Sequence, residues 1–156
     1  MTVEALTIRP FRAADQAEAR SLILTGLGEH WGWIDETINP DLDDIAAHYP
    51  PERADFVVVE DANGALIGTG GLILEDGGTG RIVRMSVAKD ARGRGLGKRL
   101  VAHLESAARA RGYRRIVCET TEGWTDAIAL YLATGFSDLG VWDGDRHFEK
   151  RLDRPA

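Results

Sequence analysis

Apolar positions alternate with polar ones in some segments of the chain and recur at helical spacing in others. Residues 6–9 alternate, which predicts a short strand, and Leu96, Leu100 and Leu104 share one side of residues 95–111, which predicts an amphipathic helix. The other predicted strands are residues 56–60, 66–75, 81–88, 114–120, 136–141 and 146–152, and the other predicted helices are residues 13–27, 39–49 and 125–134. The resulting order, β-α-α-β-β-β-α-β-α-β-β, predicts an α/β fold around a mixed sheet.

Capping residues and glycines indicate where the predicted helices begin and end. Asp15 and Thr125 stand where side chains cap the first and last helices, and Asn39 stands at the start of the second. Gly26 and Gly28 are expected to end the first helix, because glycine is a poor helix former and a common residue just beyond helix ends.

Composition indicates one globular domain that spans residues 1–156. Hydrophobic residues make up 44% of the chain and charged residues 28%, which excludes a disordered chain or a disulfide scaffold. No apolar run approaches the ~18 residues of a membrane span, and residues 1–14 lack a basic start followed by an apolar core. Cys118 is the single cysteine, so no internal disulfide is expected. We therefore expect a cytoplasmic protein.

Charge is distributed unevenly between the two halves of the chain. The net charge of −6 argues against general nucleic-acid binding. Residues 1–78 carry a net charge of −11, whereas residues 79–156 carry +5. This division suits a protein with one cationic and one anionic ligand. Simple solubility of both halves explains it equally well.

A glycine-rich turn is the most informative segment for function. Residues 92–98 read Arg-Gly-Arg-Gly-Leu-Gly-Lys and connect a predicted strand to a predicted helix. Glycines let backbone N–H groups face a bound group, and the helix N-terminus adds partial positive charge. Together they predict a binding site for a phosphate or pyrophosphate. The dinucleotide fingerprint fails because Lys98 or Leu100 takes its last glycine position, and the P-loop pattern fails because Arg99 follows Lys98.

Two motifs resemble those of the GNAT family of N-acetyltransferases. The first is Arg84-Met85-Ser86-Val87 followed by the glycine-rich turn, and the second is residues 129–136, which place Tyr131 four residues before Gly135-Phe136. The resemblance implies a mixed, mostly antiparallel central sheet with helices on both faces. It also implies direct acetyl transfer from acetyl-coenzyme A as co-substrate, with no metal. The four histidines have no metal-like spacing.

The resemblance also implies where the coenzyme binds. Its pantetheine arm would lie where strands 81–88 and 114–120 separate, and Tyr131 would protonate the departing thiolate. The residues implied to bind the coenzyme are Met85, Ser86, Val87, Arg92, Gly93, Arg94, Gly95, Leu96, Gly97, Lys98 and Asp126. Asp126 stands where many members have asparagine, and an ionised carboxylate only accepts hydrogen bonds. The alternative for Tyr131 is a core position on its helix.

Transfer to an amine also needs a proton acceptor, because an amine with a pKa near ~10 is mostly protonated at pH 7. Glu119 is the first candidate and Glu75 the second, through a water molecule. The alternative for Glu119 is a solvated carboxylate at a strand end. Arg81 stands where many relatives have a glutamate, and it cannot serve as that base.

The acceptor site is expected in the connection between the first two helices. His30-Trp31-Gly32-Trp33 offers aromatic rings for a flat or cationic group, with Asp35 and Glu36 nearby. The alternative is that these rings pack over the sheet. A further alternative concerns Arg109, Arg111, Arg114 and Arg115, which form either a solvated helix end or a contact to the adenosine-side phosphate of the coenzyme.

Three functions remain open from the sequence. The first is an N-acetyltransferase that acts on the primary amine of a small molecule or peptide, with the acidic front half favouring a cationic acceptor. The second is a non-catalytic acyl-coenzyme A sensor or regulatory module. The third is a nucleotide-binding protein that uses the same turn. Partners other than the acceptor are limited to a second copy of the chain in a homodimer, with no nucleic acid and no membrane.

Overall fold

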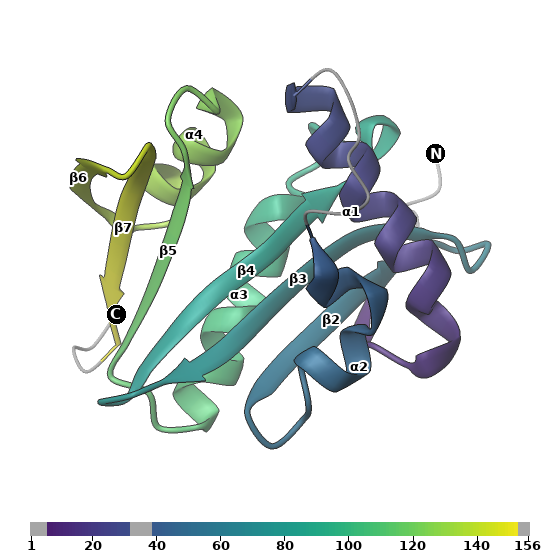
Figure 1. Cartoon of the computed structure of the whole chain (residues 1–156), viewed down its shortest axis with the longest axis horizontal. Helices are drawn as coiled ribbons and strands as arrows, with labels where there is room; N and C mark the ends of the chain where they lie inside the picture. The colour runs from purple at the N-terminus through teal and green to yellow at the C-terminus, as the bar shows by residue number, and fades with distance from the viewer. Residues whose placement is uncertain (1–5, 32–38, 153–156) are drawn as a thin grey trace.

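Within residues 6–31 and 39–152, which the computed structural model describes, seven strands form one sheet in the order β1-β2-β3-β4-β5-β7-β6 (Figure 1). The strands are β1 (Thr7–Pro10), β2 (Ala54–Glu60), β3 (Leu66–Glu75), β4 (Thr79–Val87), β5 (Arg115–Thr121), β6 (Ser137–Trp142) and β7 (Asp145–Arg151). The α-helices are α1 (Gln16–Trp31), α2 (Ile45–His48), α3 (Leu96–Ala110) and α4 (Thr125–Ala133). The predicted order of elements is confirmed.

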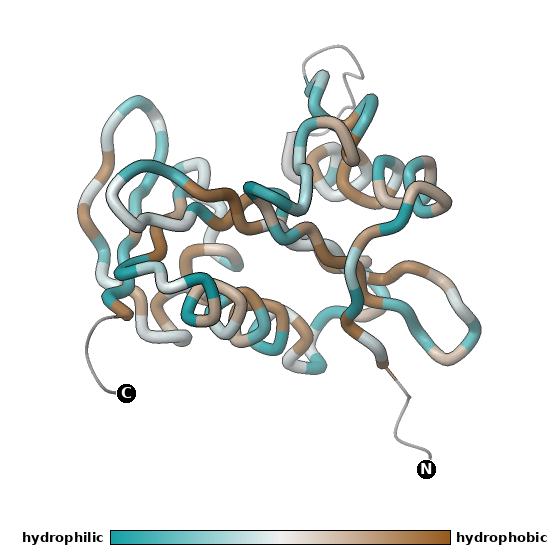
Figure 2. Tube along the Cα trace, turned by 90° about the horizontal axis from the view of Figure 1, so that it is seen from below, coloured by the Kyte–Doolittle hydropathy of each residue, from teal (hydrophilic) through white to brown (hydrophobic). Residues whose placement is uncertain are grey.

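The sheet is mixed and mostly antiparallel, as predicted. Strands β4 and β5 form its parallel pair, and the other neighbouring strands run antiparallel. Helices α1 and α2 cover one face of β2 to β4, and α3 covers the other (Figure 1). Figure 2 shows the sheet between helices on its two sides, with hydrophobic segments along its strands. No helix among the described residues combines the length and the apolar character of a membrane span.

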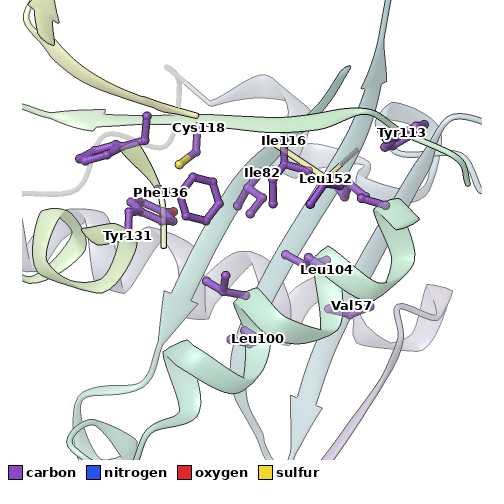
Figure 3. Close-up of a cluster of buried hydrophobic side chains, with 14 of the residues drawn as sticks. Val57, Ile82, Leu100, Leu104, Tyr113, Ile116, Cys118, Tyr131, Phe136 and Leu152 are labelled. Atoms are coloured by element: carbon purple, nitrogen blue, oxygen red, sulfur yellow. The ribbon is translucent and has the colours of Figure 1, made fainter. Parts of the chain in front are cut away.

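Two hydrophobic clusters fix the helices to the sheet. The larger joins α3 and α4 to the sheet and includes the fully buried Leu100, Leu104 and Ile116 (Figure 3). Phe148 of β7, also fully buried, belongs to the same cluster. The second lies between β2 and helices α1 and α2. The predicted helical stripe of residues 96, 100 and 104 therefore faces the core, as amphipathic spacing requires.

Helix α1 extends to Trp31, so the prediction that Gly26 and Gly28 end it is wrong. Gly26 instead serves a close contact with the sheet. A Cβ atom there would lie 2.9 Å from the Ser86 hydroxyl oxygen. Because only glycine leaves this space free, the residue brings α1 against β4 without breaking the helix.

The predicted helix starts also differ from the structure. Asp15 is the last residue of a 3₁₀ helix that leads into α1, and its carboxylate accepts the Arg12 amide at 2.8 Å. The second predicted helix is two short ones, a 3₁₀ turn and then α2, which Asp44 caps in place of Asn39. Thr125 is the first residue of α4 and makes no capping bond there. Tertiary bonds to Arg9 and Arg84, which local propensity does not encode, take up the side chains of Asp15 and Asn39.

Asp15 forms a buried ion pair that ties β1 to the start of α1. Arg9 donates to both of its oxygens, at 2.8 and 2.9 Å. This guanidinium, opposed by burial, holds the pKa of Asp15 below its ordinary value of 3.8. A depressed folded-state pKa adds stability above the unfolded-state pKa that is lost as pH falls through the folded-state value.

We therefore expect Asp15→Asn to lower the free energy of unfolding by about 2 kcal/mol at pH 7. The deficit should shrink as pH falls below about 4, because the wild-type carboxyl then protonates as well. Urea unfolding at pH 7 and pH 3 measures both values. A deficit that stays constant over this range would contradict the charge contribution.

Candidate active site

Strands β4 and β5 separate in the middle of the sheet. They pair at three positions only, Thr79 with Arg115, Gly80 with Ile116 and Arg81 with Val117. Beyond these positions β4 continues to Val87 and β5 to Thr121, but the two strands no longer pair with each other, and their ribbons diverge (Figure 1). We call this the β4–β5 split. It lies between the two strands for which the resemblance implied a separation.

A β-bulge lies in β4 beside the split. Thr69 of β3 pairs with Ser86 and Gly71 with Val83, so β4 carries one residue more than its partner over this stretch. Arg84 in the bulge has φ of 53°, a left-handed conformation that costs a non-glycine residue about 1–3 kcal/mol. Its carbonyl accepts a hydrogen bond from the buried Thr69 hydroxyl at 2.8 Å. The bulge changes the direction of the following backbone groups.

The Arg84 guanidinium binds two polar side chains, Asp41 and Asn39, from the segment before β2. It donates to both oxygens of Asp41, at 2.9 and 2.6 Å, and to the Asn39 side chain at 3.1 Å. Tyr49 donates a further hydrogen bond to Asp41 at 2.5 Å. Burial opposes ionisation of Asp41, but the bonds from Arg84 and Tyr49 outweigh it and hold its pKa below the ordinary value. Burial and Asp41 together raise the pKa of Tyr49 to about 12.

The two candidate proton acceptors meet at a single arginine. Arg81 donates to both oxygens of Glu75, at 2.7 and 3.0 Å, and also to Glu119. Each of the three side chains is about one-third exposed, at 28%, 36% and 30%. Two carboxylates against one guanidinium leave this cluster with one surplus negative charge. The structure thus brings Glu119, Glu75 and Arg81 together at the base of the split.

The glycine-rich turn lies between β4 and the N-terminus of α3. Gly93 and Gly95 have φ of 80° and 75°, and a Cβ atom on either would meet nothing within 4 Å. The first amides of α3 lack partners within the helix, as at every helix N-terminus. The turn therefore leaves room for a phosphate group to approach these amides.

The side chains around the turn have separate roles. Arg92 donates to the Val87 carbonyl at 3.0 Å and to Glu29 of α1 at 2.8 and 3.1 Å. Gly97 lies against α4, where a Cβ atom would come within 3.2 Å of Leu130. Leu96 is buried in the core at 2% exposure. Leu96 and Gly97 can therefore contact a ligand only through their backbone groups.

Residues 85–87, the last three of β4, place their side chains on alternate faces of the sheet. Met85 and Val87 pack with the α3 cluster, whereas Ser86 faces Gly26 of α1. Beyond Arg81 the β5-facing edge of β4 has no paired strand. Backbone groups along this edge are consequently free of sheet pairing with β5.

Tyr131 projects from α4 into the large cluster and is 5% exposed (Figure 3). Its ring contacts those of Phe136 and Phe148, each with a centroid distance of 5.5 Å. Burial raises the pKa of its hydroxyl above the ordinary value of 10. Burial likewise raises the pKa of the Cys118 thiol, which agrees with a buried strand residue and not with a nucleophile.

The remaining predicted site residues stand at helix ends or outside the described residues. Asp126 is exposed in the first turn of α4. His30 and Trp31 form the end of α1, not a connection, and their side chains lie outside the described residues, as do Trp33, Asp35 and Glu36. Among the described residues, no group of three or more His, Cys, Asp or Glu is arranged to hold a metal ion.

The basic residues near the end of α3 do not join the site. Arg109 donates to the Leu152 carbonyl. Arg111 donates to Asp55 and to the carbonyls of Pro51, Glu52 and Ala54. Arg115 binds Thr79 and Glu149. Arg109 and Arg111 lie at the C-terminal end of α3, whereas the glycine-rich turn lies at its N-terminal end. The structure favours the helix-end alternative over a phosphate contact.

Comparison with known proteins places the chain in a family. The model of the acetyltransferase (GNAT) family matches residues 18–136. The chain belongs to the GNAT acetyltransferase family, whose chemistry is acetyl transfer from an acyl-coenzyme A. "N-acetyltransferase 8" of Rattus norvegicus is 31% identical over 119 residues, which are 72% of this chain and 54% of that protein. The chain thus spans about half the length of this curated relative.

Solved structures agree on the fold. A GNAT family acetyltransferase from Staphylococcus aureus Mu50 has a TM-score of 0.85 at 23% identity, covering 95% of this chain and 99% of that one. The PaiA N-acetyltransferase from Thermoplasma acidophilum, in complex with coenzyme A, has a TM-score of 0.82 at 15% identity, with 95% and 99% covered. The predicted fold class is confirmed.

Sequence reasoning missed the group around Arg84. From the sequence, Asn39 stands at the start of the predicted helix 39–49, and Asp41 and Tyr49 are simply further residues of that helix. The local signal was Arg84 next to the apolar residues Val83 and Met85 of its strand, because a half-buried arginine needs an acidic partner.

Proposed function

We propose that this chain is an acetyl-coenzyme A-dependent N-acetyltransferase that acts on the primary amine of a small molecule or peptide. The observation that carries the proposal is the β4–β5 split beside an open glycine turn at the N-terminus of α3. A thioester arm would lie in the split and a diphosphate at the turn. The coenzyme A bound by the Thermoplasma acidophilum neighbour supports this choice of ligand.

The coenzyme would be held mainly by backbone groups. Amides of residues 92–98 would bind the diphosphate, with the positive charges of Arg94 and Lys98 nearby. The unpaired edge of residues 85–87 would bind the pantetheine arm. Asp126 would lie beside the coenzyme at the start of α4.

Bound acetyl-coenzyme A supplies an acyl group activated as a thioester. Tyr131 would donate a hydrogen bond to the sulfur as it leaves. A phenol with a pKa of 10 or above is protonated at neutral pH, so this hydroxyl can donate a hydrogen bond to the thiolate as it forms. Glu119, aligned by Arg81, would accept the proton that the attacking amine loses.

The surplus negative charge of the Glu75–Arg81–Glu119 cluster favours a cationic acceptor, as does the acidic front half of the chain. His30 and Trp31 at the end of α1 would contribute to the acceptor side. A homodimer and a cytoplasmic location stay predictions.

The test is a screen of amines for release of free thiol from acetyl-coenzyme A, alongside thermal unfolding with and without acetyl-coenzyme A. We expect thermal stabilisation by acetyl-coenzyme A and thiol release with at least one cationic primary amine. Tight binding without thiol release across a broad panel would favour the acyl-coenzyme A sensor. Stabilisation by a nucleotide but not by acetyl-coenzyme A would favour the nucleotide-binding protein.

We expect Glu119→Gln to lower kcat/KM for the amine about tenfold or more at pH 7. The loss should shrink toward pH 10, where more of the amine is already deprotonated. Glu75→Gln is the matched control, since both oxygens of Glu75 are already bound by Arg81, and a smaller loss is expected. If Glu119→Gln and Glu75→Gln lowered kcat/KM equally at every pH, Glu119 would not be the proton acceptor.

A further inference from the structure

We propose that Arg84 is a positioning residue for acetyl transfer, because its ion pair with Asp41 holds the β4 bulge in the conformation that the reaction uses. The inference rests on the proposed function. It gives a role to Arg84, which stands in the first motif, and adds Asp41 and Asn39, which neither the motifs nor the predicted site included. Arg84 would act through the backbone of residues 84–87, not by contact with the substrate.

Both ends of Arg84 are held in place. Its carbonyl accepts the Thr69 hydroxyl at 2.8 Å, and Thr69 is fully buried. Its guanidinium makes two bonds to Asp41 and one to Asn39, and the side chains of Arg84 and Asp41 are each 20% exposed. A left-handed φ at an arginine persists only where its surroundings fix it, and these contacts do so.

The acidic partner is itself fixed. Tyr49 donates to Asp41, and its ring packs on Phe56 of β2 with a centroid distance of 5.0 Å. Asp41 and Arg84 are 43 residues apart in sequence, so the pair joins the segment between α1 and β2 to the centre of the sheet. The bulge is thereby tied to a packed part of the fold.

The consequence for the reaction follows from where the bulge lies. It changes the direction of the amide groups of residues 85–87, which border the split. Donors aimed at the charge that develops on a reacting carbonyl act mainly in the transition state. Small displacements of such groups reduce the rate far more than the affinity. Affinity for acetyl-coenzyme A would depend mainly on the diphosphate contacts of the turn at residues 92–98, and less on the pantetheine contacts of residues 85–87.

The experiment compares Arg84→Met, Arg84→Lys and the double variant Arg84→Met with Asp41→Leu. Replacing both members of a buried pair avoids an unpaired charge and recovers stability. We expect kcat at least tenfold lower in Arg84→Met and in the double variant, a smaller loss in Arg84→Lys, and a Kd for acetyl-coenzyme A within twofold of wild type. A double variant with wild-type stability and wild-type kcat would overturn the proposal.

A matched control and a second readout make the result specific. The double variant of Arg9→Met with Asp15→Leu removes another two-bond Arg–Asp pair, away from the split, together with the bonds from Arg9 to Glu60, and should keep kcat. Amide hydrogen exchange at residues 85–87 should be at least tenfold faster in both Arg84 variants that carry methionine, but not in this control. Unchanged exchange would overturn the proposal even if the wild type transferred no acetyl group, an outcome that would separately refute the proposed function.

Discussion

Replacing Tyr131 with phenylalanine should lower kcat for acetyl transfer about a hundredfold and leave the affinity for acetyl-coenzyme A unchanged. The substitution removes one hydroxyl from a side chain whose ring is packed between Phe136 and Phe148. Because the ring contacts remain, the core should keep its packing. The lost hydroxyl matters only as the sulfur departs, so the effect falls on kcat. Thiol release under saturating acetyl-coenzyme A measures it.

Tyr113→Phe is a matched control in the same hydrophobic cluster. Tyr113 is 7% exposed, and its hydroxyl is buried without a hydrogen-bond partner among the described residues. Removing an unsatisfied buried hydroxyl should leave kcat at the wild-type value and leave the protein as stable or more stable. If Tyr131→Phe transferred acetyl groups as fast as Tyr113→Phe does, Tyr131 would be only a core residue.

The order of the elements could be predicted because a short stretch of sequence is enough to indicate each of them. The stripe of residues 96, 100 and 104 and the turn that precedes it need no distant partner to be recognised. Helix ends were less predictable where the deciding contact was distant. Gly26 has the composition of a helix end but lies against Ser86, 60 residues away in the chain.

The same distinction applies to the site. The glycine-rich turn and Tyr131 stand in contiguous motifs, and the sequence identified both as candidates. Arg81 was recognised as a departure from the family pattern, but its bonds to Glu75 and Glu119 depend on the pairing of three strands. The Arg84–Asp41 pair depends on how two distant segments pack, and no local pattern contains that information.

Replacing Gly95 with valine should weaken acetyl-coenzyme A binding about a hundredfold. Gly95 precedes α3 with φ of 75°, a conformation that costs an L-residue about 1–2 kcal/mol and a β-branched one more. Relief of this strain would move the turn and misalign the first amides of α3. The added side chain would also enter the open space beside the turn, where nothing else lies within 4 Å. Isothermal titration with acetyl-coenzyme A measures the Kd.

Gly112→Val separates this effect from strain alone. Gly112 follows α3 at its other end with φ of 78°, and a Cβ atom there also meets nothing within 4 Å. Both variants should therefore lose similar stability, about 2 kcal/mol or more by urea unfolding. Only Gly95→Val should lose affinity, because only its turn borders the β4–β5 split. Equal Kd values for the two variants would mean that the diphosphate is not held at this turn, and the coenzyme site would then have to lie elsewhere on the sheet.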